Sequence, residues 1–171
     1  MAGSQRKHNT LCWQINMQHC KQAAANLHQQ LASVGQMGYI VLIQKPYLFC
    51  NRLVGIPRNC GICNIPGDRP RAAIVAAPGL DLWMVPEYSS SDVVTCLLRT
   101  GCDQTPELYV VSAYLDITLP GVVPEPLGRL VDHCRREGKQ LLIGMDSNSH
   151  STLWGCEDDN TGRGIGRLYS Y

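Results

Sequence analysis

The sequence lacks a long apolar run, a dominant charge of one sign and any internal repeat. No window approaches the roughly 18 uninterrupted apolar residues of a membrane-spanning helix, and the basic pair near the start is not followed by the apolar stretch of a signal peptide. The formal net charge is only +1, which favours no general attraction to nucleic acid, although a local basic groove would not alter that total. We therefore expect an intracellular protein, nuclear or cytoplasmic, without a membrane partner.

Low charge and ample apolar content instead favour a packed core. Of the 171 residues, 44% are hydrophobic and 17% are charged, which argues against disorder. A chain of this length forms one domain of ordinary size and buries roughly two-thirds of its unfolded surface. We expect a disordered N-terminal arm over residues 1–10 and one domain over residues 11–171.

The nine cysteines are expected to be reduced thiols, because the chain has no secretory signal. Cys60 and Cys63 have the spacing of a zinc-binding pair. A structural zinc site needs about four ligands, and no second tight pair follows. A zinc-stapled structural domain is therefore the weakest of the alternatives for this chain.

Apolar patterning predicts strands that alternate with a few helices. Helices are predicted at 20–34 and 126–137, where apolar residues recur every three or four positions and a glycine follows. Strands are predicted at 11–18, 39–44, 72–76, 93–98, 108–114 and 139–144, with a short strand at 53–56 inside a long surface loop over 47–70. Runs that are apolar throughout are typical of strands buried on both faces. The pattern indicates a layered α/β fold with sheets packed inside.

Polar side chains stand at the ends of four of these predicted strands. They are Asn16, the Gln44-Lys45 step, Tyr114, and Asp146 with Asn148. Strand ends are where α/β enzymes place catalytic groups, because the sheet holds them rigidly. Turn chemistry alone explains any single one of them, since Asn and Asp are common turn residues. The set of four in this order favours a functional site.

These strand ends carry a family resemblance. The segment LCWQINMQHCKQAAANLHQQLA resembles the opening of the endonuclease domain of non-LTR retrotransposons, where a strand ends in Asn and a helix follows. YIVLIQKPY resembles the family's strand ending in Gln-Glu-Pro, and LYVVSAYLD resembles its strand with a Tyr. GMDSNSHSTLWG resembles its Gly-x-Asp-x-Asn-x-His…Leu-Trp-Gly segment, which is the most specific of these motifs, and NTGRGIGRL resembles its Asn-x-x-Gly segment.

The resemblance places the chain in the endonuclease/exonuclease/phosphatase family and implies its fold and chemistry. The fold would be a four-layer α/β/β/α sandwich, in which two packed mixed β-sheets are flanked by helices. The activity would be Mg²⁺-dependent hydrolysis that nicks one strand of target DNA for a fused reverse transcriptase. The wider family also acts on other phosphate esters, so a phosphatase or an RNA substrate stays open as an alternative.

The family's site residues map onto four positions. Asp146 would orient or deprotonate the attacking water, and Tyr114 would donate to the phosphate. Asn16 and Asn148 would contact phosphate or metal, so Asn16 and Asp146 are the candidate metal ligands. His150 is expected to be structural, because the family's catalytic His comes from a later Ser-Asp-His segment, and Trp154 is expected to pack.

Two departures from the family predict impaired catalysis. Lys45 stands where the family has the principal metal-binding Glu, so a cation replaces a ligand. The chain also ends at Tyr171, before the Ser-Asp-His segment, so we expect a C-terminally incomplete domain with its last strands missing. We further expect Lys45 to pair with Asp146 as an internal cation.

The alternative to an impaired nuclease is a non-catalytic remnant that binds nucleic acid or protein. Scattered arginines would serve such binding or simply be solvated surface. They are Arg52, Arg58, Arg69, Arg71, Arg163 and Arg167.

Overall fold

The structure, a computed structural model, describes residues 10–67, 69–99, 107–116, 118–119 and 122–148. The first half holds β1 (Thr10–Asn16), α1 (Lys21–Ser33), β2 (Gly38–Gln44), β3 (Leu48–Phe49), β4 (Arg52–Leu53), β5 (Gly61–Cys63) and β6 (Ala72–Ala76). The second half holds β7 (Asp81–Met84), a 3-10 turn at Pro86–Tyr88, β8 (Val93–Arg99), β9 (Leu108–Tyr114), α2 (Glu125–Glu137) and β10 (Gln140–Asp146). No helix within these ranges has the length and apolar character needed to cross a membrane.

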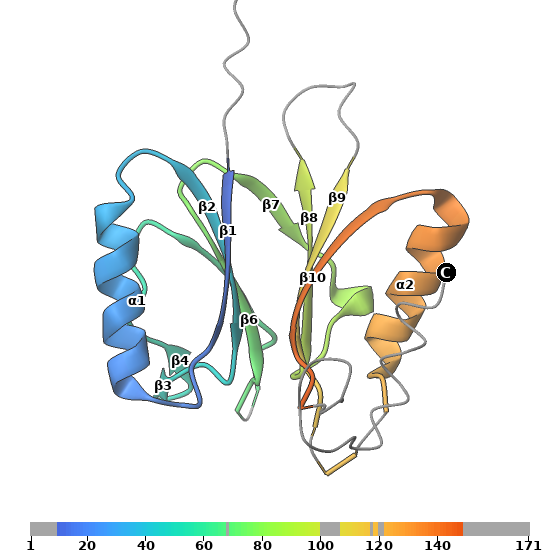
Figure 1. Cartoon of the computed structure of the whole chain (residues 1–171), viewed down its shortest axis with the longest axis horizontal. Coiled ribbons are helices and arrows are strands. Elements are labelled where there is room, and N and C mark those ends of the chain that lie inside the picture. The colour runs from blue at the N-terminus through green and yellow to red at the C-terminus, as the bar shows by residue number, and fades with distance from the viewer. Residues whose placement is uncertain (1–9, 68, 100–106, 117, 120–121, 149–171) are drawn as a thin grey trace, which may run out of the picture.

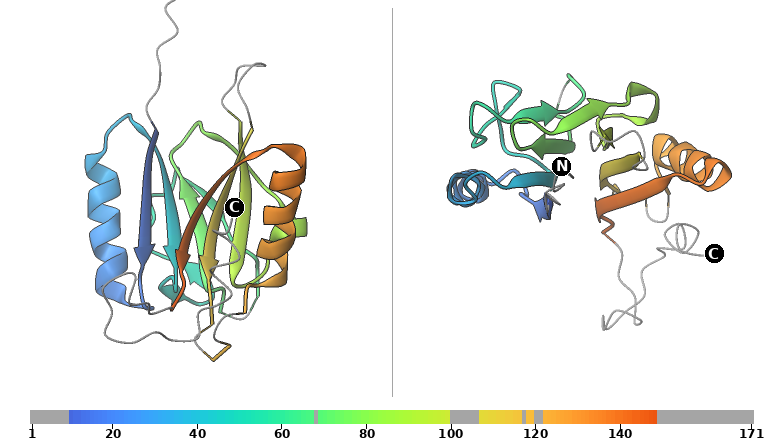
Figure 2. Two further views of the ribbon diagram at one scale, coloured as in Figure 1. Left: turned by 45° about the vertical axis from the view of Figure 1, so that its right-hand side comes forward. Right: turned by 90° about the horizontal axis from the view of Figure 1, so that it is seen from above.

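Two four-stranded sheets face each other, in the orders β1-β2-β6-β5 and β10-β9-β8-β7 (Figure 1). Each sheet has one parallel pair joined by a helix: β1 with β2 through α1, and β9 with β10 through α2. The other pairs in these two sheets are antiparallel. The helices α1 and α2 cover the two outer faces (Figures 1 and 2). The predicted four-layer α/β/β/α sandwich of two mixed sheets is confirmed.

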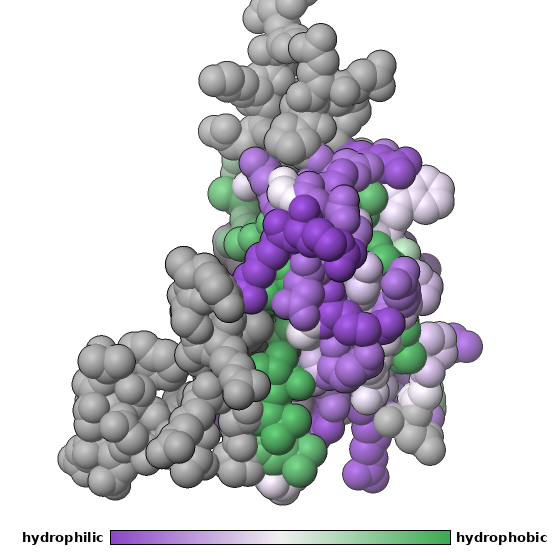
Figure 3. All heavy atoms as spheres, turned by 90° about the vertical axis from the view of Figure 1, so that its right-hand side faces the viewer, coloured by the Kyte–Doolittle hydropathy of each residue, from purple (hydrophilic) through white to green (hydrophobic). Residues whose placement is uncertain are grey.

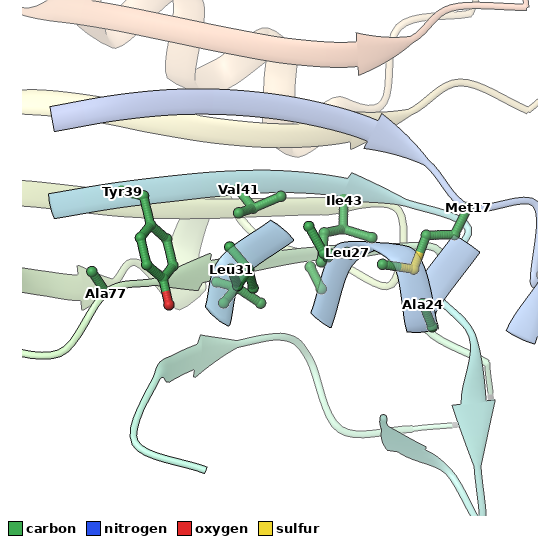
Figure 4. Close-up of a cluster of buried hydrophobic side chains, with 10 residues drawn as sticks. Met17, Ala24, Leu27, Leu31, Tyr39, Val41, Ile43 and Ala77 are labelled. Carbon is green, nitrogen blue, oxygen red and sulfur yellow. The ribbon is translucent and has the colours of Figure 1, made fainter. Parts of the chain in front are cut away.

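The side chains of β2 alternate between two of the three hydrophobic clusters that form the core. Tyr39, Val41 and Ile43 point to α1, where they pack with Leu27 and Leu31 (Figure 4). Ile40 and Leu42 point the other way, into a cluster between the sheets that also holds Ile74, Val94, Cys96 and Val110. Because both faces of β2 are covered, its run is apolar throughout, as the sequence predicted.

Helix α2 closes the second sheet in the same manner. Leu127, Leu130, Val131 and Cys134 are its buried residues, at the spacing that the sequence predicted. The helix ends at Gly138, whose left-handed backbone (φ 62°) lets its N–H bond to the carbonyl of Cys134. Polar side chains predominate on the face seen from the α2 side of the molecule (Figure 3).

The predicted loop over residues 47–70 is only partly a loop. It contains the short pair β3 and β4 and the strand β5, which adds to the edge of the first sheet. The short strand predicted at 53–56 is wrong, since β4 ends at Leu53. Strand β7 was not predicted at all. Two of its four residues are exposed, because it forms the edge of the second sheet, so it lacks a continuous apolar run.

A buried polar seam joins the two sheets near one end. The amide Nε2 of Gln44 donates to Ser112 Oγ at 3.0 Å and to the carbonyl oxygen of Gly144 at 3.1 Å. Ser112 Oγ in turn donates to the carbonyl oxygen of Ile43 at 2.8 Å. Gln44 and Ser112 are fully buried, so these bonds form away from water. They fix how the second sheet sits on the first.

Gly144 lets the sheets approach closely beside this seam. A Cβ at this position would lie 2.6 Å from Leu42 Cδ1, 3.1 Å from Leu42 Cβ and 3.3 Å from Gln14 Oε1. Leu42 belongs to the opposite sheet and is buried. Any side chain at position 144 would therefore force buried Leu42 to move or the sheets to separate.

An ion-pair clamp holds the same end of the sandwich together. Arg71 donates from Nε and Nη2 to the two oxygens of Asp92, at 2.6 Å each, and from Nη1 to Asp116. Arg71 precedes β6 of the first sheet, whereas Asp92 and Asp116 flank β8 and β9 of the second. Arg71, one of the arginines expected to be plain solvated surface, is instead held by two carboxylates.

The clamp shifts the pKa values of Arg71 and Asp116. The Arg71 guanidinium, with help from the backbone and hydroxyl of Thr118, lowers the pKa of Asp116 from its ordinary 3.8 to about 2. The hydrogen bonds that Arg71 donates to Asp92 raise the pKa of Arg71 further above its ordinary range. Arg71 and Asp116 are therefore charged at neutral pH.

Substituting Gly144 tests the close approach of the sheets. We expect Gly144→Ala to lower the free energy of unfolding by about 1–3 kcal/mol, the usual cost of overpacking. Gly128→Ala is the matched control, since Gly128 lies within α2 and a Cβ there would meet nothing within 4 Å. That control should raise stability by up to about 1 kcal/mol. Urea unfolding of both variants measures the difference, and a neutral Gly144→Ala would contradict the packing argument.

Titration of Asp116 tests the clamp. Because its folded pKa of about 2 lies below the ordinary 3.8, its contribution to stability is present above pH 4 and is lost as the pH falls towards 2. We expect Asp116→Asn to be less stable than the parent at pH 7 and to differ much less near pH 2. Glu137→Gln is the control, since the ion pair that Glu137 makes in the described part of the chain is with its exposed neighbour Arg136. Equal losses at pH 7 in both variants would rule out the clamp.

Candidate functional site at the carboxyl ends of the strands

The four parallel-paired strands end at one mouth of the sandwich. Strands β1, β2, β9 and β10 all run in the same direction (Figures 1 and 2). In register, Asn16 is the partner of Gln44 and Asp146 is the partner of Tyr114. The strand ends that the sequence singled out therefore meet, although they lie far apart along the chain.

Asn16 and Asp146 touch across the two sheets. Asn16 Nδ2 donates to Asp146 Oδ2 at 2.6 Å, and the side-chain Oδ1 of Asn16 accepts from the backbone N–H of Gln18 at 3.0 Å. The other carboxylate oxygen of Asp146 lies 3.3 Å from the backbone N–H of Asn148. Both side chains are half-buried. Donors on two sides thus hold the Asp146 carboxylate in a fixed orientation.

Two cations lie against the ring of Tyr114. Lys45 Nζ is 4.7 Å and Arg71 Cζ is 4.9 Å from the ring centroid. Tyr114 is only 4% exposed, so these contacts are largely shielded from water and cation–π attraction is effective. The ring thereby holds the end of the Lys45 side chain at the mouth.

The predicted ion pair between Lys45 and Asp146 is wrong. Among the described residues, no carboxylate oxygen lies within 4.0 Å of Lys45 Nζ. The ammonium lies on Tyr114, and the Asp146 carboxylate is bonded to Asn16 instead. Lys45 therefore does not neutralise the carboxylate beside it.

The backbone turns through left-handed residues where three of the strands end. The φ angles are 48° at Gln18, 57° at His19, 46° at Lys45 and 47° at Asn148. Such angles are uncommon outside glycine and gather at functional sites. Backbone bonds hold Lys45 there: its N–H donates to the carbonyl of Arg71 at 2.8 Å, and its carbonyl accepts from His19 at 2.9 Å.

Asn148 ties the end of β10 to the end of β9. Its side-chain Nδ2 donates to the carbonyl oxygen of Leu115 at 2.7 Å. The backbone N–H of Leu115 donates to the carbonyl oxygen of Asp146 at 2.9 Å. Asn148 therefore shapes the mouth through the backbone, in addition to supporting the carboxylate.

These residues do not fit a resident divalent cation. A Mg²⁺ ion prefers oxygen ligands and is bound through one or two carboxylates. Among the described residues, the mouth offers the Asp146 carboxylate, because Arg71 holds those of Asp92 and Asp116, and a cation, Lys45, stands nearby. The part of the chain that the structure describes holds no group of three or more His, Cys, Asp or Glu side chains placed to bind a metal.

The zinc alternative fails on geometry as well. Cys60 packs on the α1 side of the first sheet, and its Sγ lies 3.0 Å from the Tyr39 hydroxyl. Cys63 packs into the cluster between the sheets, where a hydrogen bond with Cys96 lowers its pKa. Since the two thiols lie on opposite faces, they cannot share a tetrahedral ion in this conformation. All seven cysteines in the described ranges are free.

Of the other residues that the sequence singled out, some are exposed and some lie outside the described residues. Arg52, Arg58 and Arg69 are exposed, as expected. His150, Trp154, Arg163 and Arg167 lie outside the described residues. Sequence reasoning missed Asp92 and Asp116, although both stand beside predicted strands as the other site residues do.

No family model and no curated protein matches the sequence. Among solved structures, the chain is similar to the endonuclease domain of TRAS1, a telomere-specific non-LTR retrotransposon. The two share 25% sequence identity with a TM-score of 0.66, and the match covers 91% of this chain and 68% of that one. In fold as in its strand-end motifs, the chain resembles the endonuclease domains of non-LTR retrotransposons.

Proposed function

We propose that this chain is a nucleic-acid-handling domain of the endonuclease type in which metal-dependent cleavage is impaired. The observation that carries the proposal is the position of Lys45. Its ammonium lies against Tyr114 at the same mouth as Asp146, where the family resemblance calls for a metal-binding Glu. The substrate in this proposal is a DNA phosphodiester, and the partner in a full element is a fused reverse transcriptase.

The remaining polar groups suit phosphodiester chemistry. Asn16 and the Asn148 backbone hold the Asp146 carboxylate, which would orient or deprotonate a water molecule. The Tyr114 hydroxyl would donate to a phosphate oxygen and stabilise the charge that develops on it. Asn16 and Asn148 act in this proposal mainly by positioning Asp146.

Charge explains the impairment. A protonated lysine has no lone pair for a metal. Two unit charges 4 Å apart interact by about 4 kcal/mol at an effective dielectric of 20, so a Lys beside a divalent ion opposes its binding by several kcal/mol. Without the ion, the metal's share in activating the attacking water and in stabilising the leaving oxygen is lost.

A non-catalytic binding module is the second candidate function. The ammonium of Lys45, which has no carboxylate within 4.0 Å among the described residues, favours it, because a cation can attract phosphate without cleaving it. Metal response separates the two candidates, since a working metal site gains stability from Mg²⁺ and a binding module does not.

Plasmid nicking tests the loss of cleavage directly. We expect the chain to convert supercoiled plasmid to the nicked form in Mg²⁺ no faster than a buffer control does. Asp146→Ala is the matched variant, and it should behave like the parent. Clear nicking by the parent that disappears in Asp146→Ala would refute the proposed impairment.

Thermal unfolding in Mg²⁺ tests the role of Lys45. The parent should show no gain in Tm at 10 mM Mg²⁺, at constant ionic strength. Lys45→Glu should gain stability, because it removes a cation and adds a ligand at a backbone position that suits both side chains equally. A Kd near 0.1 mM would give about 2.7 kcal/mol, or a shift of several degrees for a domain of this size.

Lys45→Gln is the control for that gain, since it removes the charge without adding a carboxylate. It should leave Tm insensitive to Mg²⁺. A gain in the parent, or an equal gain in Lys45→Gln, would show that position 45 does not decide metal binding.

A further inference from the structure

The two cations on the Tyr114 ring differ in how they are neutralised. Arg71 is held by the carboxylates of Asp92 and Asp116, so its charge is more than balanced locally. Lys45 has no carboxylate within 4.0 Å among the residues that the structure describes. Of the pair, only Lys45 has charge left for a ligand.

Lys45 is also held in place. The ammonium rests on the face of Tyr114, and its half-buried side chain starts from a backbone that is bonded on both sides, to Arg71 and to His19. A cation–π contact leaves ammonium N–H groups free to donate. Because little side-chain freedom remains to be lost, the ammonium is prepared to bind an acceptor.

Further cations stand at the same end of the molecule. The start of α1 and the pair β3 and β4 lie at the end where β1 and β2 finish (Figure 1). Lys21 and Arg52 in these elements are exposed, as is Arg69, which shortly precedes β6. Exposed positive side chains at the same end as the Lys45 ammonium suit a ligand with several separated negative charges, such as a nucleic-acid backbone.

We propose that Lys45 is a built-in phosphate contact, through which the mouth binds the phosphodiester backbone of duplex DNA without a divalent ion. This inference rests on the proposed function. It gives Lys45, which replaces the metal ligand, a role in binding DNA. The ammonium donates to a non-bridging phosphate oxygen, and the exposed cations nearby contact neighbouring phosphates. No covalent step is involved.

Binding of a short fluorescent DNA duplex, followed by anisotropy, tests the proposal. The parent should bind in EDTA, and 5 mM Mg²⁺ at matched ionic strength should not tighten binding. Lys45→Met should weaken binding and reduce the slope of log Kd against log salt by about 1, the amount expected for one lost phosphate contact. Lys45→Arg should keep the parent slope, because it keeps the charge.

Lys139→Met is the matched control. Lys139 precedes β10 at the opposite end of that strand from Asp146, and it pairs with Glu107 at 3.2 Å. This variant should leave both the affinity and the salt slope unchanged. Circular dichroism and thermal unfolding of every variant establish that each remains folded.

The outcomes separate the inference from the proposed function. If the parent binds but Lys45→Met keeps its affinity and slope, the role of Lys45 is overturned and the proposed function stands. A requirement for Mg²⁺ in the parent would also overturn the inference. If the parent binds no DNA even at low salt, both the inference and the proposed function fail.

Discussion

The close approach of the two sheets at Gly144 is the constraint on which the site depends. Leu42 of one sheet occupies the space that a side chain at position 144 of the other would need. Beside it, Gln44 reaches across to Ser112 and to the Gly144 carbonyl. With the sheets fixed there, the ends of β1 and β10 meet, and Asn16 comes within 2.6 Å of Asp146. A wider spacing would leave the same polar residues on two separate surfaces.

The buried polar seam around Gln44 fixes how the two sheets are oriented, at some cost in stability. Gln44 is fully buried, and its Oε1 has no hydrogen-bond partner in the described part of the chain. Leaving a buried polar atom unsatisfied costs about 1–3 kcal/mol, so an apolar residue would suit a plain core better. The amide is nevertheless aligned by two acceptors on its nitrogen. Three features hold the mouth rigid and keep its side chains in position. They are the buried seam, the Arg71 clamp and the left-handed turns.

How far the sequence predicts this structure depends on how local each feature is. Strand β9 was predicted because its run is largely apolar, and the buried face of α2 because apolar residues recur there every three or four positions. The meeting of the strand ends followed from the family resemblance. The Arg71 clamp could not be predicted, because it joins three loops far apart along the chain. The predicted Lys45 ion pair failed because a left-handed turn and the Tyr114 ring direct the ammonium elsewhere.

The charge at the mouth explains why phosphate binding can be kept when cleavage is lost. A glutamate with a bound divalent ion carries a net charge of +1, and a lysine alone carries the same charge. The attraction that the mouth exerts on a phosphate is therefore similar in the two cases. The chemistry differs, because a metal ion lowers the pKa of a bound water and stabilises both reacting oxygens, whereas an ammonium is only a point charge with three donors. On this argument, a change from Glu to Lys at position 45 removes the reaction while keeping the electrostatics of the bound state.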